Sequence, residues 1–279
     1  MDDAARYDPH EGQQQLHLAR YRRFRIVCCG RRWGKTLGAA AELVDHAGGV
    51  ASGDYAWIAP TYFIAERGIE AMRELAGGHV RFSGRNPVRA ELPGPDGDSR
   101  ILFLSADNPE SILGLGFRGM VVDEAARIPP EVWQYTIRPT LAQTLGLALL
   151  ISTPSGRGWF YDLFTRGKDA EEQDYASFHF PSNSNPYFPA EEWEEARRTL
   201  PADVFRQEYL AEFIEDSAGV FRNVDDCLHD ADPVRVDDVV IGCDLAKHTD
   251  FTVLVAMDRK SGQCLAMDRF NNLAWPMQK

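Results

Sequence analysis

The sequence has no long uninterrupted hydrophobic run and few cysteines. Because no stretch approaches ~18–20 apolar residues, we expect no membrane span. The acidic start MDDAARYDPH has no features of a secretory signal. The cysteines, at positions 28, 29, 227, 243 and 264, lack paired metal-ligand spacing. Their odd number and the adjacent Cys28 and Cys29 predict reduced thiols in a cytosol-like compartment.

An excess of positive charge is also missing. The net charge of −12 over 279 residues argues against a nucleic-acid-binding protein. The charge is uneven, however: residues 169–240 hold 19 acidic and 5 basic residues, and the rest of the chain has a balance of +2. Arginines cluster between Arg20 and Arg25 and between Arg81 and Arg100. Since phosphate binding responds to local charge, these clusters indicate either a DNA contact or a solvated basic face.

The N-terminal part alternates short apolar runs with helical patterns. The predicted strands are Phe24–Cys29, Tyr55–Ala59, Arg100–Leu104, Gly119–Val122 and Leu147–Ser152. The predicted helices between them are Thr36–Ala47 and Ala65–Leu75. Such alternation is typical of an α/β fold with a mostly parallel sheet flanked by helices.

The pattern changes near residue 181, where a Pro/Asn/Ser-rich loop begins. Two acidic amphipathic helices are predicted after it, over Ala190–Leu200 and Ala202–Phe213. Strands are then predicted over Val239–Asp244, Phe251–Asp258 and Cys264–Phe270, the last two as a hairpin around Lys260–Gly262. We therefore predict three parts: a domain over 1–180, a small helical subdomain over 181–236, and the incomplete beginning of another domain over 237–279.

Residues Cys29–Thr36 read CGRRWGKT and match the phosphate-loop pattern G-x-x-x-x-G-K-[ST], with Cys29 in place of the first glycine. The loop amides around Gly30 and Gly34 would wrap the β-phosphate of ATP, Lys35 would meet the β- and γ-phosphates, and Thr36 would bind Mg²⁺. The segment lies between a predicted strand and a predicted helix, as the pattern requires. The alternative is a plain strand–turn–helix junction.

Two further strand ends carry polar groups. The strand MVV ends in Asp123 and Glu124, about 90 residues after the loop. In P-loop ATPases an acid at this strand tip orders the Mg²⁺ shell and the next glutamate polarises water. Ser152 and Thr153 end another strand and can sense the γ-phosphate. Each feature alone also fits a solvated strand end, but together they predict a P-loop ATPase of the RecA-like type.

GRRWGKT, VVDEAA and ISTPSGRGWFYDLF, in this order and spacing, resemble the large terminase subunit of tailed bacteriophages. Members of that family form the ATP-driven motor that packs DNA into a procapsid. QEYLAEF (207–213) resembles the family's connector, and VIGCDLAKHTDFTVLVAMD (240–258) resembles the first hairpin of its RNase H-like nuclease. The resemblance implies an ATPase domain, a linker subdomain and a truncated nuclease domain.

The resemblance also implies roles for residues around the loop. HEGQQQLH resembles the adenine-recognition element, with Gln13 reading the base. Arg31 or Arg32 would contact the γ-phosphate in cis and act in catalysis, although a backbone-facing or DNA-facing arginine is the alternative. Trp33 belongs to the nucleotide-binding loop, and we expect its side chain to pack locally.

In the nuclease part, the resemblance implies that Asp244 binds Mg²⁺ or Mn²⁺ together with acids from other strands. Asp250, Asp258 and Asp268 are present, but the rest of the nuclease sheet is missing. Because two metal ions need several converging carboxylates, we expect no DNA cleavage by this chain.

One position departs from the family pattern Asn-Pro-x-x-x-Arg-Gly. Here Leu113 occupies the place of the arginine that can act as a finger on a neighbouring subunit. Either Arg118, Arg127 or Arg138 supplies the finger, or activation between subunits differs. An arginine finger contributes ~10³–10⁵ in rate, so the difference matters.

The resemblance implies double-stranded DNA, a portal protein and a small terminase subunit as partners, and a homo-oligomeric ring on the portal in the cytoplasm of the infected host. Two other functions stay open. One is a different P-loop ATPase such as a helicase, although we find no clear motif for stacking single strands. The other is a nucleotide-binding assembly module without turnover.

Overall fold

The computed structural model describes residues 7–76, 79–85, 87–214, 238–244 and 251–270. The chain divides into two compact units, Met1–Ala218 and Gly219–Lys279, each described below by itself. The first unit includes the two helices that we predicted as a separate subdomain, α6 (Ala190–Thr199) and α7 (Ala202–Glu208). The boundaries at residues 180 and 236 stay a prediction.

A mixed eight-stranded sheet forms the centre of the first unit, in the order β3-β4-β5-β2-β6-β7-β1-β8. The six strands from β5 to β8 run parallel, and β3 and β4 extend the sheet antiparallel. The strands are β1 (Phe24–Cys29), β2 (Asp54–Ala59), β3 (Arg81–Ser83), β4 (Arg89–Gly94), β5 (Gly97–Ser105), β6 (Gly119–Asp123), β7 (Leu147–Ser152) and β8 (Tyr175–Phe180). The predicted mostly parallel α/β fold is confirmed.

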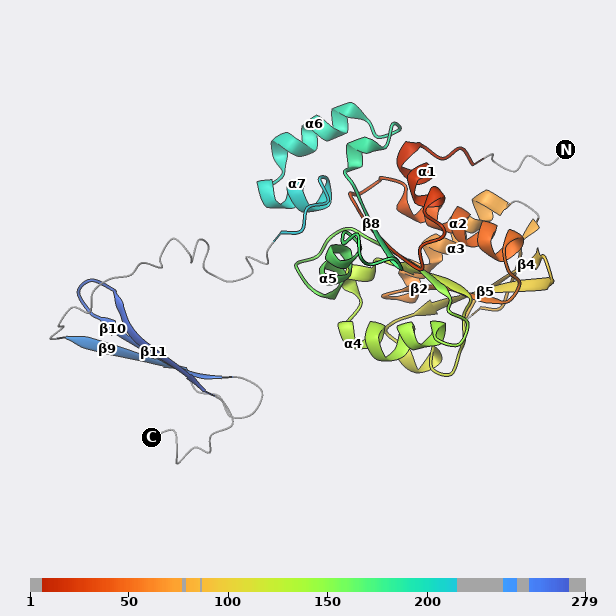
Figure 1. Cartoon of the computed structure of the whole chain (residues 1–279). Helices are drawn as coiled ribbons and strands as arrows, with labels where there is room; N and C mark the ends of the chain where they lie inside the picture. Colours follow the sequence, from red (N-terminus) through yellow and green to blue (C-terminus); the bar gives the residue numbers. More distant parts are fainter. Residues whose placement is uncertain (1–6, 77–78, 86, 215–237, 245–250, 271–279) are drawn as a thin grey trace. The chain divides into compact units, whose positions relative to one another are not determined.

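Helices cover both faces of this sheet (Figure 1). On one face lie α1 (Glu11–Leu18), α2 (Lys35–Gly49) and α3 (Tyr62–Ala76), and on the other lie α4 (Pro130–Val132) and α5 (Trp159–Arg166). Within the described residues, none of the helices combines the length and apolar composition needed to cross a membrane.

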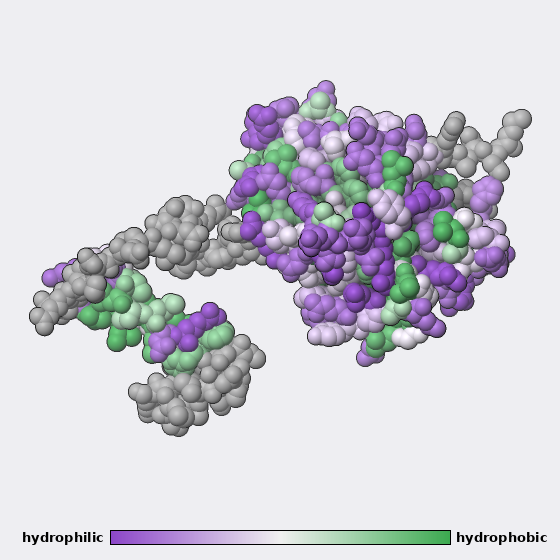
Figure 2. Space-filling model, viewed as in Figure 1, coloured by the Kyte–Doolittle hydropathy of each residue, from purple (hydrophilic) through white to green (hydrophobic). Residues whose placement is uncertain are grey.

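The burial of both faces explains the continuous apolar strands. Successive side chains of β1 alternate, so that Val27 packs with α1 to α3 and Ile26 packs on the opposite face. All six residues of β1 are buried, and so are all but the first residue of β7. The exterior of this unit is accordingly dominated by hydrophilic residues, with small hydrophobic patches between them (Figure 2).

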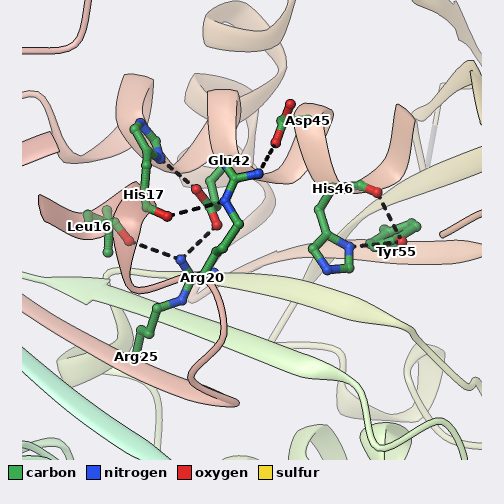
Figure 3. Close-up of polar contacts among 8 residues, drawn as sticks. All are labelled: Leu16, His17, Arg20, Arg25, Glu42, Asp45, His46 and Tyr55. Atoms are coloured by element: carbon green, nitrogen blue, oxygen red, sulfur yellow. Dashed lines mark hydrogen bonds and ion pairs between the residues drawn. The ribbon is translucent and has the colours of Figure 1, made fainter. Parts of the chain in front are cut away.

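A buried polar cluster joins α1, β1 and α2 (Figure 3). Arg25 Nη1 donates to Glu42 Oε1 at 2.7 Å and to the Leu16 carbonyl at 3.2 Å. His17 Nδ1 lies 2.5 Å from the other carboxylate oxygen of Glu42. Arg25 and Glu42 are 2% and 5% exposed, so their charges must compensate each other. The cluster fixes α1 against α2, which follows the loop.

Several elements differ from the sequence predictions. Helix α3 begins at Tyr62 rather than Ala65, and α1, β3, β4, β8 and α5 were not predicted. Helix α7 ends at Glu208, although the apolar pattern runs to Phe213. The residues that follow α7 make hydrogen bonds outside the helix. The Ser182 N–H donates to the Tyr209 carbonyl, and the Cys28 thiol donates to the Ala211 carbonyl. Ala211 has φ 57°, which is not helical. These contacts with the end of β8 and with β1 replace the helix.

The second unit contains an antiparallel sheet of β9 (Val239–Asp244), β10 (Thr252–Asp258) and β11 (Cys264–Phe270), in the order β11-β10-β9. All three strands match the prediction. In the turn, Lys260 and Ser261 N–H groups donate to the Asp258 carboxylate, and Gly262 has φ 74°. Apolar side chains such as Val240, Ile241 and Met267 are exposed on this sheet, which Figure 2 shows as a largely hydrophobic surface.

Candidate functional site

The loop Gly30–Gly34 connects β1 to α2, as predicted. Its last residue, Gly34, has φ 98°, which favours glycine, and Lys35 is the first residue of α2. Gly30 meets a different constraint, because an added Cβ would collide with the Ser182 hydroxyl and the Tyr209 carbonyl. The Gly30 N–H donates to the Phe180 carbonyl at 2.9 Å. The loop is therefore built against β8 and the segment that follows it.

The unusual first position of the loop is a packed core residue. Cys29 is fully buried, and burial raises the pKa of its thiol to about 12. Cys28 is also fully buried, and burial raises its pKa as well. Neither thiol forms a disulfide in the described structure, and the reduced state of the cysteines stays a prediction. Cys29 is the last residue of the buried strand β1, and its side chain packs in the core, so a glycine is not required at this position.

Residues before and within α1 support the loop backbone. Gln13 is 3% exposed, and its Nε2 donates to the Gly34 carbonyl at 3.0 Å while its Oε1 accepts from His10 N–H at 3.2 Å. His10 Nε2 lies 3.1 Å from the Trp33 carbonyl. Gln13 thus fixes the backbone of the loop, and its reading of the base stays a prediction.

Trp33 needs a correction as a nucleotide contact. Its indole is fully buried, stacks on Phe180 at 4.5 Å between ring centroids and donates to the Ser184 hydroxyl at 3.0 Å. The side chain packs locally, as expected, and does not line the cleft over the loop. Only its backbone belongs to the phosphate-binding loop.

The acidic pair stands at the end of β6, opposite the loop. Lys35 Nζ lies 3.3 Å from Glu124 Oε1. Glu124 has φ 48°, so the chain reverses immediately after the strand and turns Asp123 and Glu124 to different positions. Glu124 Oε2 is buried without a hydrogen-bond partner. A buried acceptor beside a lysine is suited to receive a proton or a water.

The pKa values of Lys35 and Asp123 are shifted by burial and by the ionisable groups around them. Burial, and then the charge of Glu124, raise the pKa of the Asp123 carboxyl to about 7. For Lys35, burial favours the neutral form, but Cys29, Glu124 and Asp123 outweigh it and raise the pKa of its ammonium group. A cation bound beside Asp123 would remove the cost of ionising it. The donor set of Asp123 and the Thr36 hydroxyl fits Mg²⁺.

Two hydroxyl residues, Ser152 and Thr153, lie at the end of β7, at the same edge of the sheet as the acidic pair. Asp123 pairs in register with Ile151, so Ser152 and Thr153 lie beside the acidic pair. The Ser152 hydroxyl accepts from Ala126 N–H at 3.3 Å and thus links β7 to the turn after Glu124. Thr153 lines the cleft together with Lys35, Thr36 and Glu124.

A cleft of about 680 Å³ lies over the loop and is bounded on the far side by α3. Arg67, Glu70 and Glu74 of α3 line it, and the sequence analysis missed them. Their spacing places them on one face of a helix that follows a strand ending at the same sheet edge, and this signal could have identified them. Gly68 packs directly against the Trp57 indole, so α3 lies close to β2.

The arginines named as candidates in the sequence divide into two groups by the edge of the sheet at which they lie. Arg31 is ion-paired with Glu208 of α7, and Arg31 and Arg32 both line the cleft. Arg127 Nε lies 4.0 Å from Glu124 Oε2, at the site. Two other candidates for the finger lie at the opposite sheet edge, where β1 and β2 begin. The Arg118 N–H bonds the Asp54 carbonyl, and the Arg138 guanidinium lies 5.7 Å from the Phe24 ring.

The predicted nuclease residue, Asp244, is exposed, and two of its three candidate partners lie away from it. Asp244 pairs with Val253 and Asp258 pairs with Val239, so these two acids lie at opposite ends of the sheet. Asp268 pairs with Leu254, which points to the other face from Val253. In the part of the chain that the structure describes, no group of three metal-ligating side chains is found. Asp250 lies outside the described residues.

A mostly parallel sheet with a glycine loop between β1 and α2, and an acidic pair at the end of β6 two strands away, defines a P-loop nucleotide-binding domain. The family described as "Terminase large subunit, T4likevirus-type, N-terminal" matches residues 26–225, and the chain belongs to this family of large terminase subunits. A terminase large subunit of Thermus virus P23-45 is 32% identical, with 98% of this chain and 64% of that protein aligned. One from Escherichia phage T5 is 31% identical over 68% of this chain and 44% of that protein.

Solved structures agree with this assignment. The large terminase ATPase domain of Thermus phage P74-26 has a TM-score of 0.62 and 32% identity, covering 75% of this chain and 95% of that chain. The large terminase of bacteriophage HK97 has a TM-score of 0.59 at 17% identity, covering 95% of this chain and 62% of that chain, and shows the fold alone. The chain spans 64% of the length of its Thermus virus relative.

Proposed function

We propose that this chain carries the ATP-hydrolysing part of a terminase motor that translocates double-stranded DNA into a procapsid. The observation that carries the proposal is the Lys35–Glu124 pair, 3.3 Å apart, beside the buried Asp123. In this proposal Lys35 is the phosphate-binding cation and Glu124 the proton acceptor, both lining the cleft, and the buried Asp123 next to Glu124 is the metal ligand. Membership in the large terminase family supports DNA as the substrate of the motor.

Each residue then has a role. Lys35 and the loop amides bind the β- and γ-phosphates, while Thr36 and Asp123 hold Mg²⁺, which neutralises phosphate charge when bound. Glu124 accepts a proton from the attacking water. Arg31 or Arg32 balances charge on the γ-phosphate, and for Arg31 this requires exchange of Glu208 for phosphate. Ser152 and Thr153 couple the γ-phosphate to β7.

We further propose a ring of copies on a portal protein, with a small terminase subunit and duplex DNA as partners, in the host cytoplasm. Leu113 is 59% exposed and offers no charge to a neighbouring site. Of the candidate arginines, Arg127 alone lies at the carboxyl edge of the sheet. The ATPase rate per subunit, measured against protein concentration with and without duplex DNA, tests this arrangement. A rate independent of concentration argues against a finger from a neighbour, and strand unwinding would favour the helicase alternative.

We expect Lys35→Ala to weaken ATP binding at least about 100-fold, because charge-assisted hydrogen bonds contribute roughly 1.5–3 kcal/mol each. Titration calorimetry with ATP and Mg²⁺ measures this. Lys168→Ala is the control, because Lys168 lies over the Phe164 ring on the other face of the sheet. Equal affinities of Lys35→Ala and the parent would refute the assignment of the loop.

We expect Asp244→Ala to leave the ATPase rate unchanged and the parent chain to lack nuclease activity, because Asp244 has no converging carboxylates among the described residues. Both are measured on plasmid DNA with Mg²⁺ and then Mn²⁺. Cleavage by the parent that Asp244→Ala abolishes would show that Asp244 belongs to a functional metal site in this chain.

A further inference from the structure

Four successive carbonyl oxygens of the loop, those of residues 31–34, each make a hydrogen bond to a side chain from outside the loop. The four side chains are His10, Gln13, Ser182 and Asn185. Because a carbonyl oxygen can only accept, the His10 ring carries a proton on Nε2. Two of these donors precede β1 and two follow β8, so segments that are far apart in the chain hold the same stretch of backbone.

Two N–H groups of the loop, those of Arg32 and Gly34, have no hydrogen-bond acceptor among the described residues. A phosphate oxygen accepts hydrogen bonds, so a phosphate-binding loop must present N–H groups and keep its carbonyl oxygens away from the anion. The side chains that bind the loop carbonyls therefore stabilise the peptide orientation that a phosphate requires.

Arg32 has a backbone conformation that is unfavourable for a residue with a Cβ atom. Its φ of 60° lies in the left-handed region, which glycine adopts more readily. Such a conformation persists only where the surrounding structure over-determines it. The hydrogen bond from Asn185 Nδ2 to the Arg32 carbonyl, at 2.9 Å, is a contact that does so.

Asn185 is itself held in the orientation that this hydrogen bond needs. Its Oδ1 accepts from the Tyr187 N–H at 2.9 Å, which directs the amide nitrogen toward the loop. Its own N–H donates to the Ser182 carbonyl at 3.1 Å. Asn185 is half-buried and lies outside the hydrophobic core, so shortening its side chain opens no cavity there.

We propose that Asn185 is a positioning residue for phosphate binding, because it holds the Arg32 carbonyl outside the loop before a nucleotide binds. Without this amide, the Arg32 backbone relaxes toward negative φ, and the free N–H groups of the loop lose their alignment. The proposal rests on the proposed ATPase function and concerns only the phosphates of the ligand. Any ligand that carries the same phosphates is therefore affected to the same degree.

The test compares pyrophosphate with ADP by calorimetric titration in the presence of Mg²⁺. Asn185→Ala should weaken both ligands by the same factor, roughly 3–10-fold, which corresponds to the usual contribution of one hydrogen bond. Asn185→Asp keeps the acceptor for the Tyr187 N–H and loses the donor to Arg32, so it should weaken both ligands at least as much.

A double-mutant cycle separates this positioning role from a general loss of structure. Glycine adopts positive φ without external support, so the effect of Asn185→Ala should largely disappear in an Arg32→Gly background. An equal loss of pyrophosphate affinity in both backgrounds would mean that Asn185 does not act through the Arg32 backbone, and it would overturn the proposal.

The matched control is Asn183→Ala, since Asn183 belongs to the neighbouring turn Ser182–Ser184, is exposed and does not bond the loop. It should bind both ligands like the parent. Unchanged pyrophosphate affinity in Asn185→Ala or Asn185→Asp would contradict the proposal, and so would a loss confined to ADP, which would indicate a contact with the nucleoside. Failure of the ATPase function gives a different result, in which Lys35→Ala binds both ligands like the parent.

Discussion

Glu124→Gln is expected to lower ATP turnover by about 10²–10⁴-fold, the usual contribution of a positioned general base. Glutamine keeps the shape of the side chain and its contact with Lys35, but it cannot accept a proton from water. ATP affinity should stay similar or increase slightly, because the substitution removes a negative charge 3.3 Å from the phosphate-binding lysine. Single-turnover hydrolysis and calorimetry separate the two effects.

The control for this variant is Glu70→Gln. Glu70 lines the same cleft from α3 but lies outside the Lys35–Glu124–Asp123 group. It should leave turnover close to that of the parent, so that a general effect of cleft charge can be excluded. If Glu124→Gln hydrolyses ATP as fast as the parent, Glu124 is not the base, and the assembly-module alternative gains support.

Glu42→Gln is expected to reduce the free energy of unfolding by about 3–5 kcal/mol, because it leaves the buried Arg25 without its charge partner. Arg25 Nη1 donates to Glu42 at 2.7 Å, and both residues are buried between β1 and α2 (Figure 3). Urea unfolding followed by circular dichroism measures the loss. Loosening of α1 should follow, since His17 also bonds Glu42.

The pH dependence of this difference has a defined sign. Burial raises the pKa of Glu42, but hydrogen bonds from His17 and Arg25 and their charges outweigh it and hold the pKa below its ordinary value. The stabilisation is therefore complete above the ordinary carboxyl pKa of about 4.3 and is lost as pH falls through the lower, folded-state pKa. The difference between parent and Glu42→Gln should shrink in that acidic range.

Asp45→Asn is the matched control for Glu42→Gln. Asp45 is on the same helix and pairs with Arg20 at 2.8 Å, but both side chains are about half exposed, at 57% and 49%. Such surface pairs contribute about 0–1 kcal/mol. Comparable destabilisation by the two substitutions would mean that burial of the Arg25–Glu42 pair has no special energetic consequence.

Lys35, Thr36 and Glu124, which line the cleft, could be singled out from the sequence because their signals are local. The pattern of a strand, a glycine loop and a helix can be recognised from residues that are neighbours in the sequence. The apolar runs of β1, β6 and β7 likewise predict buried parallel strands. The positions of Lys35, Thr36, Asp123 and Glu124 at one sheet edge follow from the parallel order alone. The family relation of these motifs was also visible in the sequence and is confirmed.

Other features depended on contacts between residues far apart in the chain. Gln13 and Trp33 carry polar and aromatic groups suited to a nucleotide, but packing against Gly34 and Phe180 buries them. The end of α7 is set by bonds to residues of β1 and the segment after β8 rather than by helical pattern. The same bonds bring Tyr187 and Tyr209 beside the loop.

The sequence by itself therefore determined the α/β class, the loop, the acidic pair and the family, because each rests on short-range pattern or chain order. Only the tertiary structure decided which face each polar group presents, how α3 borders the cleft, and that residues after β8 line a cavity with Arg31 and Arg32. The physical reason is that burial and hydrogen-bond partners are set by packing across about 150 residues of chain, as between Arg31 and Ser182.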